Sequence, residues 1–272
     1  MVKICLKSAL FSLLLLSGLK ANDTLVAAKN LISNEAFNHK LELLLEGKSL
    51  ENERGYIDYS ALSSLLKSNS LLDSSSADSR DLSLSFKSDA GAVLFIKAVN
   101  EALNATGFVH FTPQRLDLTK EEKIYTIDVQ SRYNLDIGSF YNILKRNSIF
   151  IKNIQKTGAN SYEYELDFGD ALLKSNVNVP LNQNVDLKRP LRDYFFTTKN
   201  ASSVKILANA ADSWFAKILF LDKDLKLIQA ITSKEKNNSF SSEIPSNAEY
   251  MVVGDSFNLD NIRRGLSVFL AR

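Results

Sequence analysis

Apolar and polar residues first follow a helical period along the chain. Between residues 25 and 46 apolar side chains recur at approximately helical spacing and stop at Gly47, which predicts an opening helix. A second helix is predicted after the run 56–59, with its leucines on one face. The serine-rich tract 73–79 breaks this periodicity and predicts a loop.

From residue 81 to residue 170, strand and helix periods follow one another in the order β-α-β-β-α-β, with one extra hairpin strand. Ser88 or Asp89 is expected to cap the first helix, and Asp136 the second. The predicted strands are 82–86, 108–111, 123–130, 149–155 and 161–168. This order is the split βαβ plan of ferredoxin-like domains.

After about residue 177 the helical signal disappears. Short apolar runs recur between turn clusters such as 222–224 and 236–239, which predicts an antiparallel β-sandwich. These runs are 204–208, 214–221, 225–231, 250–253 and 266–270. The predicted fold class is therefore α+β. It has N-terminal helices in residues 22–80, a ferredoxin-like βαββαβ unit in 81–170 and a C-terminal β-sandwich in 177–272, with the boundary near residues 170–180.

Residues 1–21 have the pattern of a secretory signal peptide. Lys3 and Lys7 precede the apolar run 9–16, and the small Ala21 fits the position before a cleavage point. The apolar run is shorter than the roughly 20 residues that cross a bilayer. We therefore expect cleavage after Ala21, export to the periplasm, and no membrane insertion after cleavage.

Composition supports this location. Removing the three lysines of the leader from the 33 basic residues leaves 30, against 31 acidic residues. With that balance and no Lys/Arg block, nucleic acid is not an expected partner. The only cysteine, Cys5, lies in the leader, so the mature chain would be held by packing without disulfides, as suits a bacterial periplasm.

Three motifs resemble catalytic signatures. The run 254–257, Gly-Asp-Ser-Phe, resembles the nucleophile block of GDS-type esterases, but no histidine follows Ser256, so a strand end and turn is favoured. Ser64 and Lys67 match one mark of penicillin-binding enzymes and 156–158 another, but the third is absent between them, and 156–160 indicates a hairpin turn. The triplet 167–169, Asp-Phe-Gly, lacks its kinase partners and indicates a strand end.

The remaining polar groups form no recognisable centre. His39 and His110 lie far apart in the chain and give no metal-ligand spacing. Glu163, Glu165 and Asp167 share one strand face, which indicates a solvated surface rather than a glycosidase pair, although sequence does not exclude carboxylates meeting in a cleft. We assign no catalytic, cofactor-binding or metal-binding residue and expect no cofactor.

One modification site is a candidate. Asn237 stands in the run 235–239, Glu-Lys-Asn-Asn-Ser, with the acidic residue two positions before it that bacterial periplasmic N-glycosylation requires. The run is predicted to be an exposed turn. An unmodified polar turn is the alternative.

Two resemblances bear on the role of the chain. The segments 55–59, 93–104 and 132–141 are similar to secreted proteins of flagellated epsilonproteobacteria, some of which are linked to flagellar motility. This resemblance implies a non-enzymatic role in envelope or motor assembly and transfers no functional residue. The stretch 204–231 is similar to the β-sandwich end of periplasmic maltose-operon proteins.

We therefore expect a non-enzymatic binding or scaffold protein of a cell-envelope assembly, with flagellar motility as its context and envelope or flagellar motor proteins as partners. The candidate anchors are aromatic, because aromatic side chains dominate interface energetics. They are Tyr56, Tyr59, Tyr194, Phe195 and Phe196. The run 194–196 can equally belong to the core. A peptidoglycan- or glycan-binding protein is the alternative function, and an unrecognised periplasmic hydrolase is the third.

Overall fold

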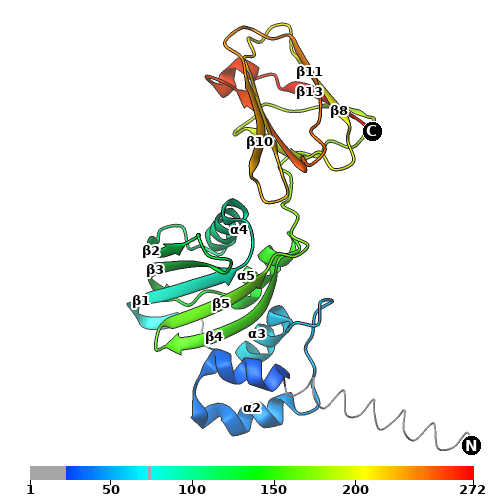
Figure 1. Ribbon diagram of the computed structural model, residues 1–272. Helices are drawn as coiled ribbons and strands as arrows, with labels where there is room; N and C mark the ends of the chain where they lie inside the picture. Colours follow the sequence, from blue (N-terminus) through cyan, green and yellow to red (C-terminus); the bar gives the residue numbers. More distant parts are fainter. Residues whose placement is uncertain (1–22, 73–74) are drawn as a thin grey trace, which may run out of the picture. The chain divides into compact units, whose positions relative to one another are not determined.

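A computed structural model describes residues 23–72 and 75–272 (Figure 1). The predicted leader lies outside the described residues. The chain divides into two compact units, of which unit 1 ends at Ala171 and unit 2 runs from Leu172 to Arg272. The fold class is α+β, as the sequence predicts.

The described part of unit 1 begins with helices that are shorter than predicted. Residues 23–32 are helical and are followed by η1 (Glu35–Phe37), α2 (Asn38–Leu45) and α3 (Tyr59–Ser68). The single helix expected over 25–46 is wrong, because Ser33 adopts a left-handed backbone with φ of 48°. Asn34 then starts a new turn by accepting a hydrogen bond from Ala36 N at 3.1 Å.

The sheet of unit 1 has five strands in the order β2-β3-β1-β5-β4. β1 pairs with β3 antiparallel and with β5 parallel, and β5 pairs with β4 antiparallel. The strands are β1 (Ser75–Ser88), β2 (Thr112–Asp117), β3 (Lys123–Tyr133), β4 (Phe150–Gly158) and β5 (Ser161–Asp167). The extra hairpin strand is thus β5, which lies between β1 and β4.

The serine-rich tract is not a loop where it is described. β1 begins at Ser75, which pairs with Tyr133, and an irregularity separates this pair from the regular register that starts at Arg80. The small polar side chains of this tract do not favour a strand, but pairing with β3 provides hydrogen-bond partners for its backbone.

The strand expected over residues 108–111 is also misplaced. Gly107 ends the preceding helix with φ of 94°, and Phe108 N bonds back to Leu103 O at 2.9 Å. These residues therefore close the helix, and the chain reaches the sheet edge only at Thr112.

Two further helices, α4 (Ala92–Ala105) and α5 (Ile137–Lys145), connect the strands. Asp136 caps α5 as predicted, accepting from Ser139 N at 3.4 Å. The cap expected for α4 is wrong, because the N-cap is Gly91 and no side chain bonds to the helix there. Ser88 instead accepts a hydrogen bond from Ala90 N.

The core of unit 1 lies between the sheet and the helices. On β1 the buried Leu82, Leu84 and Phe86 alternate with partly exposed residues. Phe86 stacks on Tyr164 with ring centroids 5.1 Å apart, and Phe140 of α5 packs against both rings. This aromatic cluster fixes α5 on one face of the sheet.

Unit 2 contains two four-stranded sheets, in the orders β10-β9-β12-β7 and β11-β8-β13-β6. Every strand pair in it is antiparallel. The strands are β6 (Asn184–Asp186), β7 (Tyr194–Thr197), β8 (Ser203–Ala208), β9 (Ala216–Leu221), β10 (Leu227–Thr232), β11 (Ser239–Glu243), β12 (Tyr250–Asp255) and β13 (Leu266–Ala271), and η2 (Leu259–Ile262) precedes β13.

The pairing in unit 2 is mirror-symmetric about the turn 222–226. β9 pairs with β10, β8 with β11, β7 with β12, and β6 with β13. Buried side chains from both sheets form one core that includes Trp214, Phe196 and Phe220. The strands of unit 2 therefore pair in the order of one long hairpin. This hairpin folds into two sheets, which share a core.

Candidate functional site

Unit 1 contains a cavity of about 700 Å³ at one end of its sheet. The strands β1, β3 and β5 supply its floor, while the N-terminus of α5 and the residues that follow α4 supply its walls. This volume is in the range of ligand pockets, about 300–1,000 Å³.

The floor of this cavity is apolar because the strand register brings buried side chains together. Leu82 lies opposite Val129, and Leu84 lies beside Tyr162. All four residues, with Tyr164, line the cavity. The rim carries two exposed apolar side chains, Val109 and Tyr133, with exposed fractions of 58% and 65%. An apolar ligand would therefore bury apolar surface against both the floor and the rim of the cavity, which the hydrophobic effect favours.

An ion pair forms one polar wall. Lys67 of α3 donates to Asp136 Oδ1 at 2.8 Å, and Asp136 also accepts from Ser139 at the start of α5. Burial raises the pKa of Asp136, but the Lys67 ammonium and the Ser139 donors outweigh it, so that the pKa is lowered overall. The wall thus carries a fixed, compensated charge pair.

Tyr164 contributes a polar group to the floor. Its side chain is buried and lines the cavity, yet no hydrogen bond from a described residue reaches its hydroxyl. Burial raises the pKa of Tyr164, so the hydroxyl is neutral and can donate. The hydroxyl can therefore bond to water or to a polar group of a ligand in the cavity that Tyr164 lines.

A second cavity of about 410 Å³ adjoins the first, since Leu72, Asn134 and Tyr162 line both. It is lined by two cationic side chains, Arg80 and Lys156. Arg80 donates one Nη to Asn134 Oδ1, but its buried Nε has no hydrogen-bond partner among the described residues. Neither cation forms an ion pair with a described residue.

Sequence reasoning missed this site. Tyr164 belongs to a strand face that predicts only core, and Arg80 stands beside a tract interpreted as a loop. The sequence contains one signal for this cation. Arg80 is the first basic residue after the serine-rich tract, and an alternating strand follows it directly. The folded register was needed to bring it beside Tyr162.

The predicted aromatic anchors are mostly core residues. Tyr59, Tyr194 and Phe196 are at most 3% exposed. Assigning Tyr59 as a surface anchor is therefore wrong, and for Tyr194 and Phe196 the core alternative is confirmed. Their spacing explains the burial, since Tyr59 begins the apolar face of α3 and the other two alternate along β7. Phe195 is half-buried and stacks on Tyr250, and Tyr56 is half-buried and donates to Asp167.

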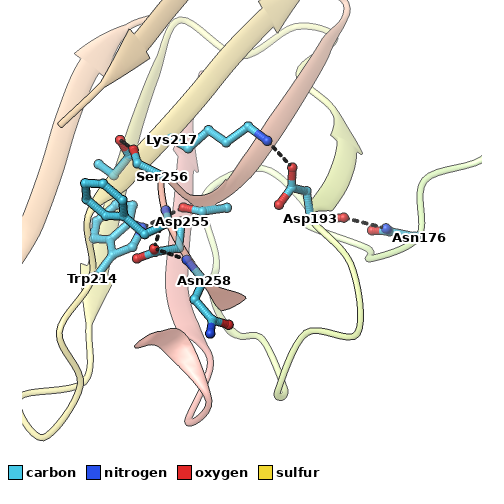
Figure 2. A network of polar contacts seen from close by, with 10 residues as sticks. Asn176, Asp193, Trp214, Lys217, Asp255, Ser256 and Asn258 are labelled. Atoms are coloured by element: carbon cyan, nitrogen blue, oxygen red, sulfur yellow. Dashed lines mark hydrogen bonds and ion pairs between the residues drawn. The ribbon is translucent and has the colours of Figure 1, made fainter. Parts of the chain in front are cut away.

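Figure 2 shows the surroundings of the Gly-Asp-Ser motif. Ser256 donates its hydroxyl to Ala216 O at 3.0 Å. Asp255 is 7% exposed, and its carboxylate accepts backbone hydrogen bonds from Phe215, Phe257 and Asn258. The motif therefore joins strand ends, and Ser256 is bonded to the backbone rather than to a base.

A neighbouring contact explains the glycine of this motif. A Cβ on Gly254 would lie 2.1 Å from Asp193 Oδ1. Asp193 forms an ion pair with Lys217 at 2.8 Å, and the two side chains point toward one another in Figure 2. Trp214 Nε1 donates to Gly254 O at 2.7 Å. The close approach of these groups leaves no space for a side chain at position 254.

The marks of penicillin-binding enzymes have structural roles too. Ser64 donates to Ser60 O, one turn earlier in α3, while Lys67 is paired with Asp136. Residues 156–158 end β4, and the turn at 159–160 leads into β5, as the hairpin interpretation predicts.

The acidic strand face is a set of ion pairs. Glu163 pairs with Lys87 at 2.7 Å, and Glu165 pairs with Lys152 at 3.4 Å. Asp167 ends β5, as predicted for the Asp-Phe-Gly triplet, and accepts from Gly169 N. The described residues contain no cluster of three or more potential metal ligands.

Asn237 lies in the connection between β10 and β11 and is half-buried. Its side-chain oxygen accepts from Ala216 N at 3.1 Å, and its backbone N donates to Trp214 O at 2.7 Å. The asparagine therefore ties two connections together, and its glycosylation stays a prediction.

No family model matches the sequence, and no curated protein or solved structure was found to be similar to it. Within the described ranges, no helix has the length and apolar character needed to cross a bilayer.

Proposed function

We propose that this chain is a non-enzymatic binding protein of the cell envelope, and that unit 1 holds an amphipathic small molecule. The apolar body of the ligand lies in the larger cavity, against Leu82, Leu84 and Val129. Its acidic head group lies in the smaller cavity at Arg80. The envelope location rests on the predicted leader.

The observation that carries this proposal is the state of Arg80. Its guanidinium keeps a buried Nε without a partner and has no described carboxylate to balance it. A buried, unpaired donor is unfavourable by about 1–3 kcal/mol, and more when it is charged. A carboxylate, sulfate or phosphate group would restore this bonding in the bidentate geometry that guanidinium favours.

The contacts of the catalytic look-alikes support binding rather than catalysis. Ser256 and Ser64 donate to backbone carbonyls, and Lys67 is held in an ion pair. A nucleophile must instead lie within reach of a base that accepts its proton. The apolar cavity has the composition of a binding pocket, in which a few polar groups orient a mostly apolar ligand.

We also propose finer assignments for the two units. The connection from β1 through α4 to β2, with β3 between these strands, supports a ferredoxin-like plan into which β5 is inserted. The mirror-symmetric pairing of β6 to β13 supports a β-sandwich of the jelly-roll type. Neither assignment identifies a ligand by itself, because function depends on the site.

A fluorescent fatty-acid analogue tests the ligand class. Purified full-length chain is titrated with 11-(dansylamino)undecanoic acid and, separately, with its uncharged methyl ester. We expect Arg80→Gln to weaken binding of the acid about tenfold or more, because a hydrogen bond to a charged group contributes about 1.5–3 kcal/mol. Binding of the ester should stay unchanged.

Two further variants locate the probe. Val129→Trp fills the floor and should abolish binding of both probes, while Arg115→Gln removes a surface cation of β2 and should leave both unchanged. Far-ultraviolet circular dichroism checks that each variant folds. Equal affinity for acid and ester, insensitive to Arg80→Gln and Val129→Trp, would overturn the proposal.

A further inference from the structure

One end of unit 2 gathers four connections between strands, which we call the loop end. They are residues 187–193, 209–215, 233–238 and 256–265. The connections are bonded to one another: Ser213 N donates to Asn261 O, Asn237 N donates to Trp214 O, and Arg189 pairs with Asp260. The loop end is therefore one continuous built surface.

Asp255 holds an aromatic pair at this surface. Its buried carboxylate accepts from the backbone N of Phe215 and of Phe257, both at 2.8–2.9 Å. The two rings meet edge to face with centroids 5.0 Å apart. Phe257 remains 66% exposed, so a buried carboxylate fixes the backbone that presents an aromatic side chain to solvent.

A second apolar side chain protrudes from the neighbouring connection. Leu191 is 96% exposed and follows Pro190, whose ring restricts the backbone. The connection is tied down on both sides of Leu191, because Tyr194 donates its hydroxyl to Lys188 O at 2.6 Å and Arg189 pairs with Asp260. Two anchored connections thus each present one exposed apolar side chain at the same end.

Positive charge surrounds these side chains. The four connections contain seven Lys or Arg residues and four Asp or Glu residues. Asp193, Asp212 and Asp260 are each paired with a cation. Glu235 is then the one acid of these connections that forms no ion pair with a described residue. Five cations form no ion pair with a described residue: Lys188, Arg192, Lys234, Lys236 and Arg263.

The opposite end of unit 2 shows that this charge is local. Its connections 198–202, 222–226 and 244–249 contain three lysines and three acids. No exposed aromatic side chain lies in them. Of the two ends of unit 2, the loop end is therefore the one that combines an excess of positive charge with protruding apolar side chains.

We propose that the loop end docks on an anionic lipid bilayer. Leu191 and Phe257 enter the boundary between head groups and acyl chains, while the surrounding Lys and Arg side chains lie at the level of the lipid phosphates. A bilayer suits this surface because it accommodates separate protruding side chains without a matching pocket. The docking is peripheral, involves no spanning helix and is independent of the cavity in unit 1.

Vesicle co-sedimentation of the full chain tests this inference. One set of vesicles contains phosphatidylcholine alone, and the other contains phosphatidylcholine with an equal share of phosphatidylglycerol. We expect at least about tenfold stronger partition onto the anionic vesicles, since each cation near such a surface adds attraction. Raising the salt concentration should weaken partition through screening.

Paired variants locate the surface. Arg192→Glu with Arg263→Glu should lower partition onto anionic vesicles about tenfold or more. Leu191→Ser with Phe257→Ser should lower it at every salt concentration. The matched controls lie at the opposite end of unit 2, where Lys223→Glu with Lys226→Glu, and Leu227→Ser, should each change partition less than about twofold. The fluorescence of Trp214 checks that unit 2 is folded.

Three results would overturn the proposal. The first is equal partition onto neutral and anionic vesicles, and the second is a loss in the control variants as large as in the loop-end variants. The third is release from anionic vesicles by soluble polygalacturonate together with no effect of Leu191→Ser and Phe257→Ser, because this would identify the surface as a general polyanion site.

Discussion

The two units differ in how completely their buried polar side chains are hydrogen-bonded. In unit 2, buried Asp255 and Asp212 are fully engaged, and Trp214 donates to Gly254 O. The buried side-chain atoms without a partner among the described residues, Ser63 Oγ and Arg80 Nε, both belong to unit 1. A satisfied interior stabilises a fold, while an unsatisfied atom beside a cavity indicates space for a ligand.

The largest effect on stability is expected when a buried group that has its hydrogen-bond partners is removed. Asp255→Ala leaves three backbone N–H donors without their acceptor, so we expect unit 2 to lose about 3 kcal/mol or more of unfolding free energy. Urea unfolding followed by the fluorescence of Trp214, the only tryptophan of the chain, reports on unit 2. Asp260→Ala, at an exposed ion pair, is the control and should change stability by less than about 1 kcal/mol. Equal effects of the two variants would contradict the central role of Asp255.

The second-largest effect on stability is expected at Gly254, which lies close to the carboxylate of Asp193. Gly254→Ala places a Cβ against Asp193 Oδ1 and should cost about 2 kcal/mol through overpacking. Asp193→Ala removes the obstructing carboxylate, so the double variant should be more stable than the sum of the two single effects predicts. Strict additivity in urea unfolding would show that the contact is not the cause.

Two tyrosines of unit 1 provide a matched pair. Tyr59 accepts a hydrogen bond from Ile154 N at 3.0 Å, so Tyr59→Phe leaves a buried donor unpaired and should cost about 1–2 kcal/mol. Tyr164→Phe removes a hydroxyl that no described residue bonds, so unfolding monitored by circular dichroism should change by less than about 0.5 kcal/mol. A large loss for Tyr164→Phe would mean that its hydroxyl is already satisfied in the protein.

A small effect is also expected in the dependence of the unfolding free energy on pH. The pKa of Asp136 is lowered in the folded state, so the unfolded chain takes up the proton first as pH falls. The stabilisation is complete at pH values above the ordinary pKa of an aspartate, and it is lost as the pH falls through the lowered pKa of the folded state. The loss should be less than about 1 kcal/mol, because the ion pair with Lys67 is partly exposed. Asp136→Asn should flatten this part of the profile of unfolding free energy against pH. An unchanged profile would exclude the ion pair as its source.

Local patterns predicted much of the fold. Alternation located β5 and the regular part of β1, and an acidic cap before an apolar face located the start of α5 at Asp136. The break at Ser33 and the strand pairing of Ser75 were not predictable, because a left-handed residue and a distant partner strand decide them. Burial of Tyr59 was encoded in its helical spacing but was outweighed by the expectation that aromatic side chains serve as anchors.

The candidate sites depend on long-range register and were less predictable. Arg80 meets Tyr162 only after β1 and β5 pair, and the apolar floor requires β3 as well. The Gly-Asp-Ser run was correctly interpreted as a turn, but its sequence does not reveal that one carboxylate holds both Phe215 and Phe257. Such convergence is a property of tertiary structure rather than of any local pattern.

The mirror pairing of unit 2 also orders the events of its folding. β9 and β10 meet across one short turn, whereas Asp186 of β6 must find Ser267 of β13 over a separation of 81 positions. Loop-closure entropy favours the inner pair first, and each later pair shortens the distance to the next. A chain delivered from its N-terminus would therefore keep the edge of β6 unpaired until residues 266–271 emerge, and unit 2 would be exposed to misassembly throughout that interval.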